Sequence, residues 1–170
     1  MLDPSLEIVK ASEQDIEVIL SLNQLLHVEA SEFRGNTYDF VKQEVAKGNY
    51  FVVKDGGKVV AAACISPRDE GVYLETLSVS EAYQKRGIGS ELIEHAKKVT
   101  KDHGYDKLFV DTYHQYSADV FYTKCGFKMI PTMAKYKGQP YRKYLTKLPS
   151  TADAEYPADH AFVLDLSRFG

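Results

Sequence analysis

The six residues from Gln84 to Gly89, Gln-Lys-Arg-Gly-Ile-Gly, have the types and spacing of a phosphate-binding turn. Residues 72–79 before them are typical of a β-strand, and residues 90–103 after them have the apolar spacing of an amphipathic helix. Glycine lets a backbone come close to a ligand, and free amides at a helix start attract an anion because the helix dipole lies behind them. We therefore expect the chain to hold a phosphorylated small molecule.

The turn differs from two widespread phosphate loops. It lacks the longer glycine-rich span and the Gly-Lys-Ser/Thr ending of a Walker loop. It also lacks the three glycines behind a first strand, and the acidic residue about 20 positions later, that mark a dinucleotide fold. An ordinary strand-to-helix turn would have the same pattern, so its meaning depends on the elements around it.

Patterns typical of strands and helices alternate along the chain, as in a mixed α/β domain with one layered sheet. Strands are expected at residues 6–9, 50–54, 58–65, 72–79, 107–113, 127–136 and 141–148, and helices at 12–30, 37–48, 90–103 and 117–125. We expect one domain over residues 1–149 and a C-terminal extension over residues 150–170. Within the extension, residues 161–166 are a candidate for an extra strand at a sheet edge, in the same subunit or as a dimer arm in a partner.

The composition of the 170 residues argues against several classes of function. Hydrophobic residues make up 44% and charged residues 26%, which is ordinary for a globular domain. The formal net charge of -3 argues against a broad nucleic-acid surface. No apolar run approaches the length of a membrane span and the N-terminus has no leader pattern, so a cytoplasmic protein without a membrane partner is expected.

The two cysteines, Cys64 and Cys125, each lie in an apolar stretch. Buried free thiols in a reducing compartment are their expected state. No spacing of histidines and cysteines resembles a zinc site, and no metal is expected.

Two motifs in this order resemble the GCN5-related N-acetyltransferase (GNAT) family, over residues 6–148. The first is the turn at Gln84–Gly89, which fits [Gln or Arg]-x-x-Gly-x-[Gly or Ala], and the second is Ala-x-x-x-Tyr-x-x-x-Gly-Phe at residues 118–127. The resemblance implies an acyl-CoA N-acyltransferase fold of the α/β class, in which helices flank a central, mostly antiparallel twisted sheet. It also implies acetyl-CoA as acyl donor and a primary amine of a small molecule or protein as acceptor.

The resemblance also implies how the donor is held. In that family the turn binds the pyrophosphate of acetyl-CoA, and the backbone of the preceding strand meets the pantetheine arm. The residues assigned to the donor in this way are Leu77, Ser78, Val79, Gln84, Lys85, Arg86, Gly87, Ile88, Gly89, Ser90, Gln115 and Tyr122. Gln115 stands where the family often has asparagine, and it offers the same donor and acceptor on a longer arm.

Transfer to an amine requires a base, because a lysine-like amine of pKa about 10.4 is charged at pH 7 and its neutral form costs roughly 4.6 kcal/mol. Glu75 is the candidate base, acting through water. Period-two alternation places Tyr73, Glu75 and Leu77 on one face of their strand, close to the reacting end of the donor. A solvated or salt-bridged carboxylate is the plainer interpretation, and His114 is a second candidate base.

Tyr122 is the candidate general acid. Its phenol, with an ordinary pKa of about 10, is protonated at pH 7 and can donate to a departing thiolate. The family resemblance supports this role and also implies that the main-chain amide near Leu77 polarises the thioester carbonyl. The plainer interpretation makes Tyr122 a core aromatic that shares a helix face with Phe121 and Cys125.

The acceptor is the least defined part of the expected site. Residues 26–37 link the first two helices, and their carboxylates, Glu29 and Glu32, could attract a cationic amine or could simply be solvated. The tyrosines of the last expected hairpin could form an acceptor wall or the face of a homodimer: Tyr136, Tyr141 and Tyr144.

Two other functions stay open alongside the acetyltransferase. One is a sensor or interaction module that binds an acyl-CoA without turnover. The other is a transferase of a longer acyl group, because nothing in the sequence fixes the acyl pocket. Thiol release and donor binding, measured together, distinguish the sensor from an enzyme, and a panel of acyl-CoA donors distinguishes the transferase of a longer acyl group.

Overall fold

The computed structural model describes residues 2–24, 37–68, 71–112, 118–130, 135–136, 139–140 and 160–165. The strands of its main sheet are β1 (Leu6–Lys10), β2 (Tyr50–Asp55), β3 (Lys58–Pro67), β4 (Val72–Val79), β5 (Lys107–Thr112), β6 (Lys128–Ile130) and β9 (His160–Asp165). Their spatial order is β1-β2-β3-β4-β5-β9-β6. The β4–β5 pair is parallel and the other pairs in this sheet are antiparallel. The expected mixed and mostly antiparallel sheet is confirmed.

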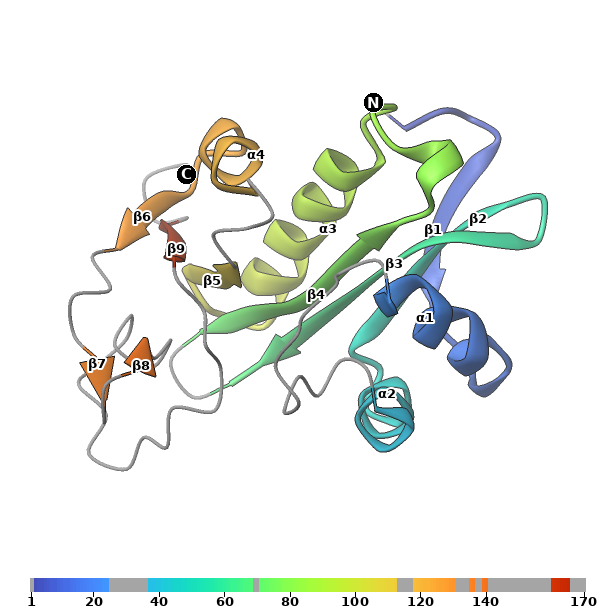
Figure 1. Cartoon of the computed structure of the whole chain (residues 1–170), viewed down its shortest axis with the longest axis horizontal. Coiled ribbons are helices and arrows are strands. Elements are labelled where there is room, and N and C mark those ends of the chain that lie inside the picture. The colour runs from blue at the N-terminus through green and yellow to red at the C-terminus, as the bar shows by residue number, and fades with distance from the viewer. Residues whose placement is uncertain are drawn as a thin grey trace.

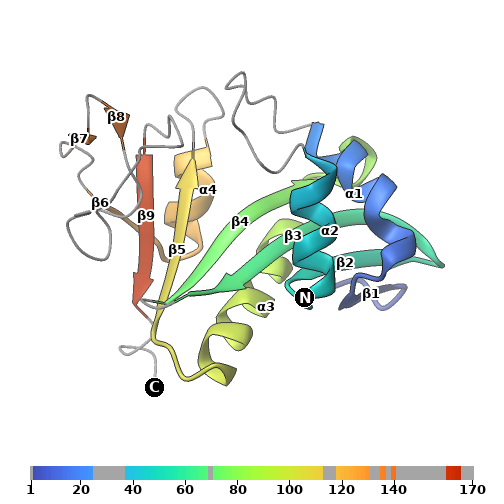
Figure 2. The same ribbon diagram turned by 90° about the horizontal axis from the view of Figure 1, so that it is seen from below.

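Helices cover both faces of the sheet. The α-helices in the described ranges are α1 (Ile16–Asn23), α2 (Tyr38–Ala46), α3 (Ile88–Asp102) and α4 (Ala118–Lys124). α1 and α2 lie on one face, and α3 and α4 lie on the other (Figures 1 and 2). None of these helices is long and apolar enough to span a membrane.

Local capping explains where the first two helices begin. The carboxylate of Asp15 accepts a hydrogen bond of 2.8 Å from the amide of Ser12, as the sequence predicts, and a short 3-10 turn leads into α1. The Thr37 hydroxyl accepts from the amide of Phe40 at 3.3 Å and starts α2. α1 ends at Asn23, and the rest of the helix expected to reach residue 30 lies outside the described residues.

Two apolar cores fix the helices on the sheet. Ile19 of α1 and Val41 of α2 are fully buried with Val52 of β2 on one face. Leu92 and Ile93 of α3 are fully buried on the other face. Each such side chain contributes about 1.5–3 kcal/mol by leaving water. The second core holds α3 in place, so its first turn is fixed at the end of β4.

β4 contains a bulge at Glu75. Its partner strand β3 pairs Cys64 with Thr76 and then Ile65 with Leu74, so Glu75 has no residue opposite it. An unopposed residue of this kind redirects the side chains that follow it and increases the local twist.

The bulge corrects one expectation about the site. Leu74 and Leu77 both pack into the core beneath α3, although they are three residues apart. The charge of Glu75 instead acts on Tyr50 and Cys64, which belong to the core beneath α1 and α2. The expectation that Glu75 and Leu77 share a face is therefore wrong, because the extra residue shifts the two-residue period between them.

The C-terminal part of the sheet holds one strand of the expected last hairpin. β6 pairs with β9, and the expected pairing of residues 127–136 with residues 141–148 stays a prediction, because residues 141–148 lie outside the described residues. A separate two-stranded sheet joins β7 (Lys135–Tyr136) to β8 (Gln139–Pro140). Residues 141–159 lie outside the described residues.

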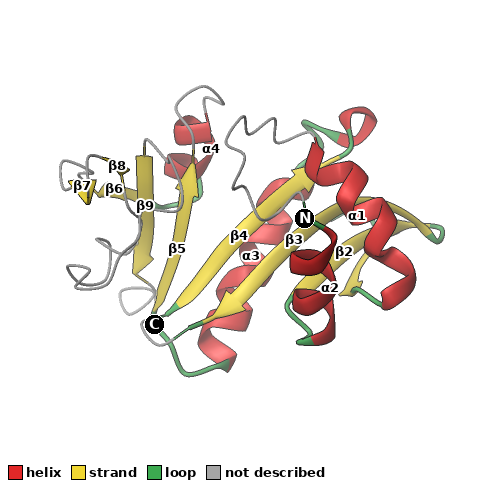
Figure 3. Ribbon diagram, turned by 60° about the horizontal axis from the view of Figure 1, so that its bottom comes forward, coloured by secondary structure: helices red, strands yellow, loops and turns green. Residues whose placement is uncertain are grey.

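The segment expected as an extra strand forms β9, but it lies inside the sheet rather than at an edge. β9 runs antiparallel to β5 from His160, opposite Thr112, to Asp165, opposite Lys107, and its other side pairs with β6 (Figure 3). β6 pairs with residues 161–163 of β9, and the alternation of the β9 sequence does not encode this second partner. The division of the chain at residue 149 stays a prediction.

Candidate active site

The strands β4 and β5 pair at their starts and then separate. Residues 72–74 pair with residues 108–110, whereas β4 continues to Val79 and β5 to Thr112. Figure 2 shows the two strands diverging from this junction. Over residues 75–79 the β5-facing edge of β4 therefore carries backbone groups that no described strand pairs. Such an edge can pair with an extended ligand.

The predicted contacts to the pantetheine arm lie on this open edge. Leu77, Ser78 and Val79 pair with residues 61–63 of β3 on their other side, so only the edge toward β5 is open. The Ser78 hydroxyl points away from that edge and donates to Asn23 Oδ1 of α1 at 2.9 Å. At residues 77–79, the groups that face β5 are therefore main-chain groups.

The turn at Gln84–Gly89 leads from β4 to α3, as the sequence predicts. Gln84 closes the turn, because its Nε2 donates to the carbonyl of Val79 at 3.0 Å. Lys85 has φ +63° and Gly87 has φ +84°, so two left-handed residues aim the chain into the helix that starts at Ile88. Among the hydrogen bonds of the described residues, none uses the amides of residues 85–90. Free amides at the start of a helix can bind an anion.

An arginine of the turn is held against an aromatic ring. The guanidinium carbon of Arg86 lies 4.8 Å from the ring centroid of Tyr83. The Tyr83 hydroxyl donates to Asp55 Oδ2 at 2.6 Å, and this hydrogen bond raises the pKa of Tyr83. The stacked ring therefore limits where Arg86 can place its charge beside the turn.

The two sequence motifs meet in space. A Cβ at Gly89 would lie 3.2 Å from the ring of Phe121 of α4, so a side chain there would require that ring to shift slightly. Gly126, with φ +97°, ends α4 in a left-handed conformation, and the amide of Phe127 returns to the carbonyl of Tyr122 at 3.0 Å. Spacing alone did not predict this contact between the motifs.

Tyr122 is a buried residue on α4, with 7% of its surface exposed. Its ring packs edge-to-face on Phe121 and Phe127, with centroids 5.2 and 5.5 Å apart. It belongs to the same core as Ile88 at the start of α3. The tyrosine is therefore rigidly held beside the turn, and the core interpretation and the acid role are both compatible with this place.

Glu75 is a buried carboxylate with an arginine partner. Its side chain is 4% exposed and forms an ion pair with Arg68, whose Nη2 donates to Glu75 Oε1. Glu75 is thus a salt-bridged carboxylate, as the plainer interpretation of the sequence expects. The sequence missed Arg68, which lies in the loop between β3 and β4, seven residues before Glu75.

A buried polar network that the sequence also missed lies beneath α1. Asn23 Nδ2 donates to the Tyr50 hydroxyl at 3.1 Å, and that hydroxyl lies 3.0 Å from Thr76 Oγ1. Burial raises the pKa of Tyr50, so its hydroxyl stays protonated. Together with the bond from Ser78 to Asn23, the network ties α1 and β2 to β4 on both sides of Leu77.

Several predicted residues lie outside the described part of the chain. Gln115 and the alternative base His114 fall in residues 113–117. The candidate acceptor residues of the first helix connection fall in residues 25–36, and two of the three candidate tyrosines fall in residues 141–159. Tyr136 is in β7, of whose side chains nothing is described.

Both cysteines are free, and burial raises the pKa of each thiol. The Cys64 thiol donates to Glu44 Oε1 at 3.7 Å. A raised pKa disfavours the reactive thiolate at neutral pH. Over the described ranges, no group of three or more potential metal ligands is found.

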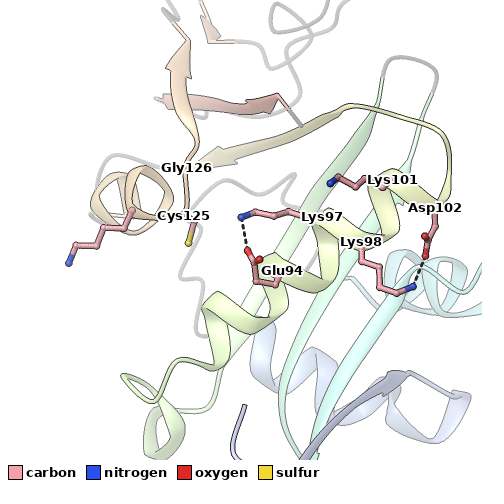
Figure 4. A pocket seen from close by; sticks show the side chains of 8 residues that line it. Glu94, Lys97, Lys98, Lys101, Asp102, Cys125 and Gly126 are labelled. Atoms are coloured by element: carbon pink, nitrogen blue, oxygen red, sulfur yellow. Dashed lines mark hydrogen bonds and ion pairs between the residues drawn. The ribbon is translucent and has the colours of Figure 1, made fainter. Parts of the chain in front are cut away.

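A cavity of about 560 Å³ opens between α3 and the C-terminal end of α4 (Figure 4). It is lined by Glu94, Lys97, Lys98, Lys101, Asp102, Lys124, Cys125 and Gly126. Two of its lysines are paired, Lys97 with Glu94 at 2.5 Å and Lys98 with Asp102 at 2.7 Å. None of the residues assigned to the donor lines it.

Two proteins of assigned function resemble parts of the chain. Beta-lysine N(6)-acetyltransferase of Methanococcus maripaludis is 30% identical over 81 residues, which are 46% of this chain and 30% of that protein. N-alpha-acetyltransferase 50 of Danio rerio is 27% identical over 135 residues, which are 77% of this chain and 79% of that protein. The match thus spans less than a third of the length of the first relative and most of the second.

A solved structure and a family profile complete the comparison. PaiA N-acetyltransferase of Thermoplasma acidophilum, solved in complex with coenzyme A, has a TM-score of 0.68 and 16% identity, over 94% of this chain and 98% of its own. At that identity the likeness shows a shared fold. The profile of the acetyltransferase (GNAT) family matches residues 19–127, which include the β4 edge, the turn and Tyr122. The chain therefore belongs to the GNAT family of acetyltransferases.

Proposed function

We propose that the chain is an acetyl-CoA-dependent N-acetyltransferase that moves an acetyl group to a primary amine of a small molecule or protein. The observation that carries the proposal is the divergence of β4 from β5 beside the open amides that start α3. An open strand edge suits an extended arm with amide groups, and a helix start suits a pyrophosphate. Family membership supports the same donor.

In this proposal each part of the donor has its own contact. The amides of residues 85–90 hold the pyrophosphate, with added charge from Lys85 and Arg86. The main chain of residues 77–79 holds the pantetheine arm, and the Leu77 amide polarises the thioester carbonyl. Gln115 is proposed as a further donor contact.

Glu75 is the proposed base. The acceptor ammonium gives one proton, through a water molecule, to the Glu75 carboxylate, and the neutral nitrogen then attacks the thioester carbonyl carbon. Burial raises the proton affinity of a carboxylate, whereas the ion pair with Arg68 keeps the group ionised, so that a proton can be accepted.

Tyr122 is the proposed acid. As the carbon–sulfur bond breaks, the departing thiolate takes the phenolic proton, and the second amine proton leaves to solvent. The support is its fixed position on α4, packed on Phe121, which itself faces Gly89 in the first turn of α3.

The acceptor is proposed as a class only. The names of the two relatives place acetylation at N(6) of beta-lysine and at an N-alpha position, which are both amines. A primary amine is therefore the proposed acceptor. A cytoplasmic location and a homodimer stay predictions.

Thiol release from acetyl-CoA, measured with the full chain across free amino acids, polyamines and peptides with a free N-terminus, tests this function. We expect release that requires an amine and is matched by N-acetylated product. Tyr122→Phe keeps the ring packing and removes the acidic proton, so turnover should fall by about a hundredfold or more while donor binding is kept.

Thr123→Ala is the matched control, because it removes an exposed hydroxyl from the same helix and should leave turnover unchanged. Donor binding without release for any amine would favour the sensor, and faster release from a longer acyl-CoA would favour the other transferase. Wild-type turnover in Tyr122→Phe would remove the acid role.

A further inference from the structure

An arginine holds the carboxylate that the proposed function uses as its base. Arg68 Nη2 donates to Glu75 Oε1, and the exposed fractions of the two side chains are 29% and 4%. A carboxylate that has lost nearly all contact with water is costly to keep charged unless a cation pairs with it. Arg68 supplies that cation and keeps it at all accessible pH values, because its guanidinium does not deprotonate in proteins.

Arg68 is itself held in place by its surroundings. Its amide donates to the carbonyl of Gly71 at 2.8 Å, which closes the loop between β3 and β4. Its guanidinium carbon lies 4.9 Å from the ring centroid of Tyr73. That ring stacks on Phe109 of β5, with centroids 5.1 Å apart and an angle of 26° between the planes. Arg68 is thus anchored at the junction from which β4 and β5 diverge.

Among the residues that the structure describes, two further titratable groups interact with Glu75 without adding a positive charge. Tyr50 of β2 and Cys64 of β3 both feel the Glu75 charge, and burial raises the pKa of each, so both are neutral near pH 7. Glu44 of α2 acts on Cys64 as a second negative charge. Among the described residues, Arg68 is the cation that pairs with Glu75.

We propose that Arg68 is a positioning residue for acetyl transfer, which keeps the Glu75 carboxylate ionised and aimed so that it can accept a proton near and below neutral pH. The inference rests on the proposed function, in which Glu75 takes one proton from the acceptor ammonium through water. Arg68 forms and breaks no covalent bond in this step. Its effect is exerted through the protonation state of Glu75.

The test is the pH dependence of kcat/KM, from about pH 5 to about pH 9, for the wild type, Arg68→Gln and Arg68→Lys. A nearby cation lowers the pKa of a carboxyl group by about 1–3 units, so its removal should move the acidic limb upward by that amount. At each pH, kcat/KM of the variant is divided by that of the wild type, because the ionisation of the amine affects both equally and drops out of this ratio. For Arg68→Gln we expect a ratio near one at the alkaline end that falls steadily toward low pH.

Arg68→Lys separates charge from shape. It keeps the charge and loses the planar fork, so its acidic limb should stay near that of the wild type. A loss of activity that is equal at every pH would mean that Arg68 only supports the fold, and it would overturn the inference. An unchanged acidic limb in Arg68→Gln would overturn it as well.

Two further variants control for folding and for the loss of a charge elsewhere. Lys98→Gln breaks an exposed ion pair with Asp102 on α3 and should leave the profile unchanged. The double variant Arg68→Gln/Glu75→Gln replaces the ion pair with two neutral amides, so it shows whether the site still folds. If the double variant melts near the temperature of the wild type, the site folds without the ion pair. The shifted acidic limb of Arg68→Gln is then assigned to the charge of Glu75.

A carboxyl ¹³C NMR titration of Glu75 tests the pairing without any substrate. The midpoint should be higher in Arg68→Gln than in the wild type. A shifted midpoint in a chain without turnover would support the pairing and overturn the proposed function. An unshifted midpoint in an active chain would overturn the inference and leave the function standing.

Discussion

Gly87 sets the direction of the first amides of α3. It is the residue that caps the helix, with φ +84° and ψ 4°, and a side chain there would meet no atom within 4 Å. The requirement for glycine is therefore one of backbone conformation rather than space, because residues with a Cβ adopt this region at a cost. The proposed pyrophosphate site depends on this one conformation.

Gly87→Ala should weaken donor binding more than it affects chemistry. We expect a loss of about 1–2 kcal/mol of stability and a several-fold rise in the KM for acetyl-CoA, with kcat little changed, because the turn lies away from the reacting carbon. Gly104→Ala is the matched control, since Gly104 has φ +78° and open space but lies past the other end of α3. It should melt earlier without a change in KM. Equal KM values for all three proteins would contradict the role of the turn.

At the residue scale, the sequence could predict the turn and not the ion pair. Gln84 to Gly89 is defined by residue types and by the strand and helix on either side of it. The pairing of Arg68 with Glu75 joins a loop residue to a strand residue, and no periodic signal in the sequence marks such a contact. A binding turn formed by consecutive residues could be predicted from the sequence. An ion pair between residues that only the fold brings together could not.

At the scale of elements, buried hydrogen bonds hold β4 to its neighbours. The hydroxyl of Tyr50, a fully buried residue of β2, contacts Asn23 of α1 and Thr76 of β4. Asn23 in turn accepts from Ser78, so the network grips β4 on both sides of Leu77. Because buried polar groups must keep their partners, this network makes the open edge of β4 rigid.

Tyr50→Phe should cost about 1–3 kcal/mol of unfolding free energy, because two buried polar groups lose a hydrogen-bond partner. Urea unfolding measures the loss. Tyr38→Phe removes the hydroxyl of an exposed tyrosine at the start of α2 and should have no effect. If the two variants were equally stable, the network would not contribute to the fold.

Element types could be predicted more readily than element placement. The helical spacing of α3 and the alternating strands around Gly56 and Gly57 follow from local sequence, and the structure has them. β9 lies between β5 and β6. The sequence of residues 160–165 predicts a strand but does not specify which strands it pairs with. The same holds for the bulge, since Glu75 looks like any other strand position.

At the scale of the molecule, the sheet has two parts that share a short parallel junction. β1 to β4 form one part, and β5, β9 and β6 form the other, with residues 72–74 paired to residues 108–110 between them. α3 and α4 meet where Gly89, in the first turn of α3, faces Phe121. The divergence of the strands and the contact of the helices bring the open β4 edge, the turn and Tyr122 into one region.

The two motifs allowed the family and the donor to be predicted from sequence, because both belong to that one region. The acceptor could not be predicted in the same way. Its candidate residues are spread over the first helix connection and the C-terminal third, and their types also suit an ordinary solvated surface.

The most direct test of the account is an amide NMR titration of the full chain with acetyl-CoA. The account predicts that the largest shifts fall on the main-chain amides of residues 77–79 and 85–90, with Gly104 unaffected. Shifts confined to the cavity near Lys97 and Lys101, with residues 77–79 and 85–90 unchanged, would contradict the placement of the donor between β4 and α3.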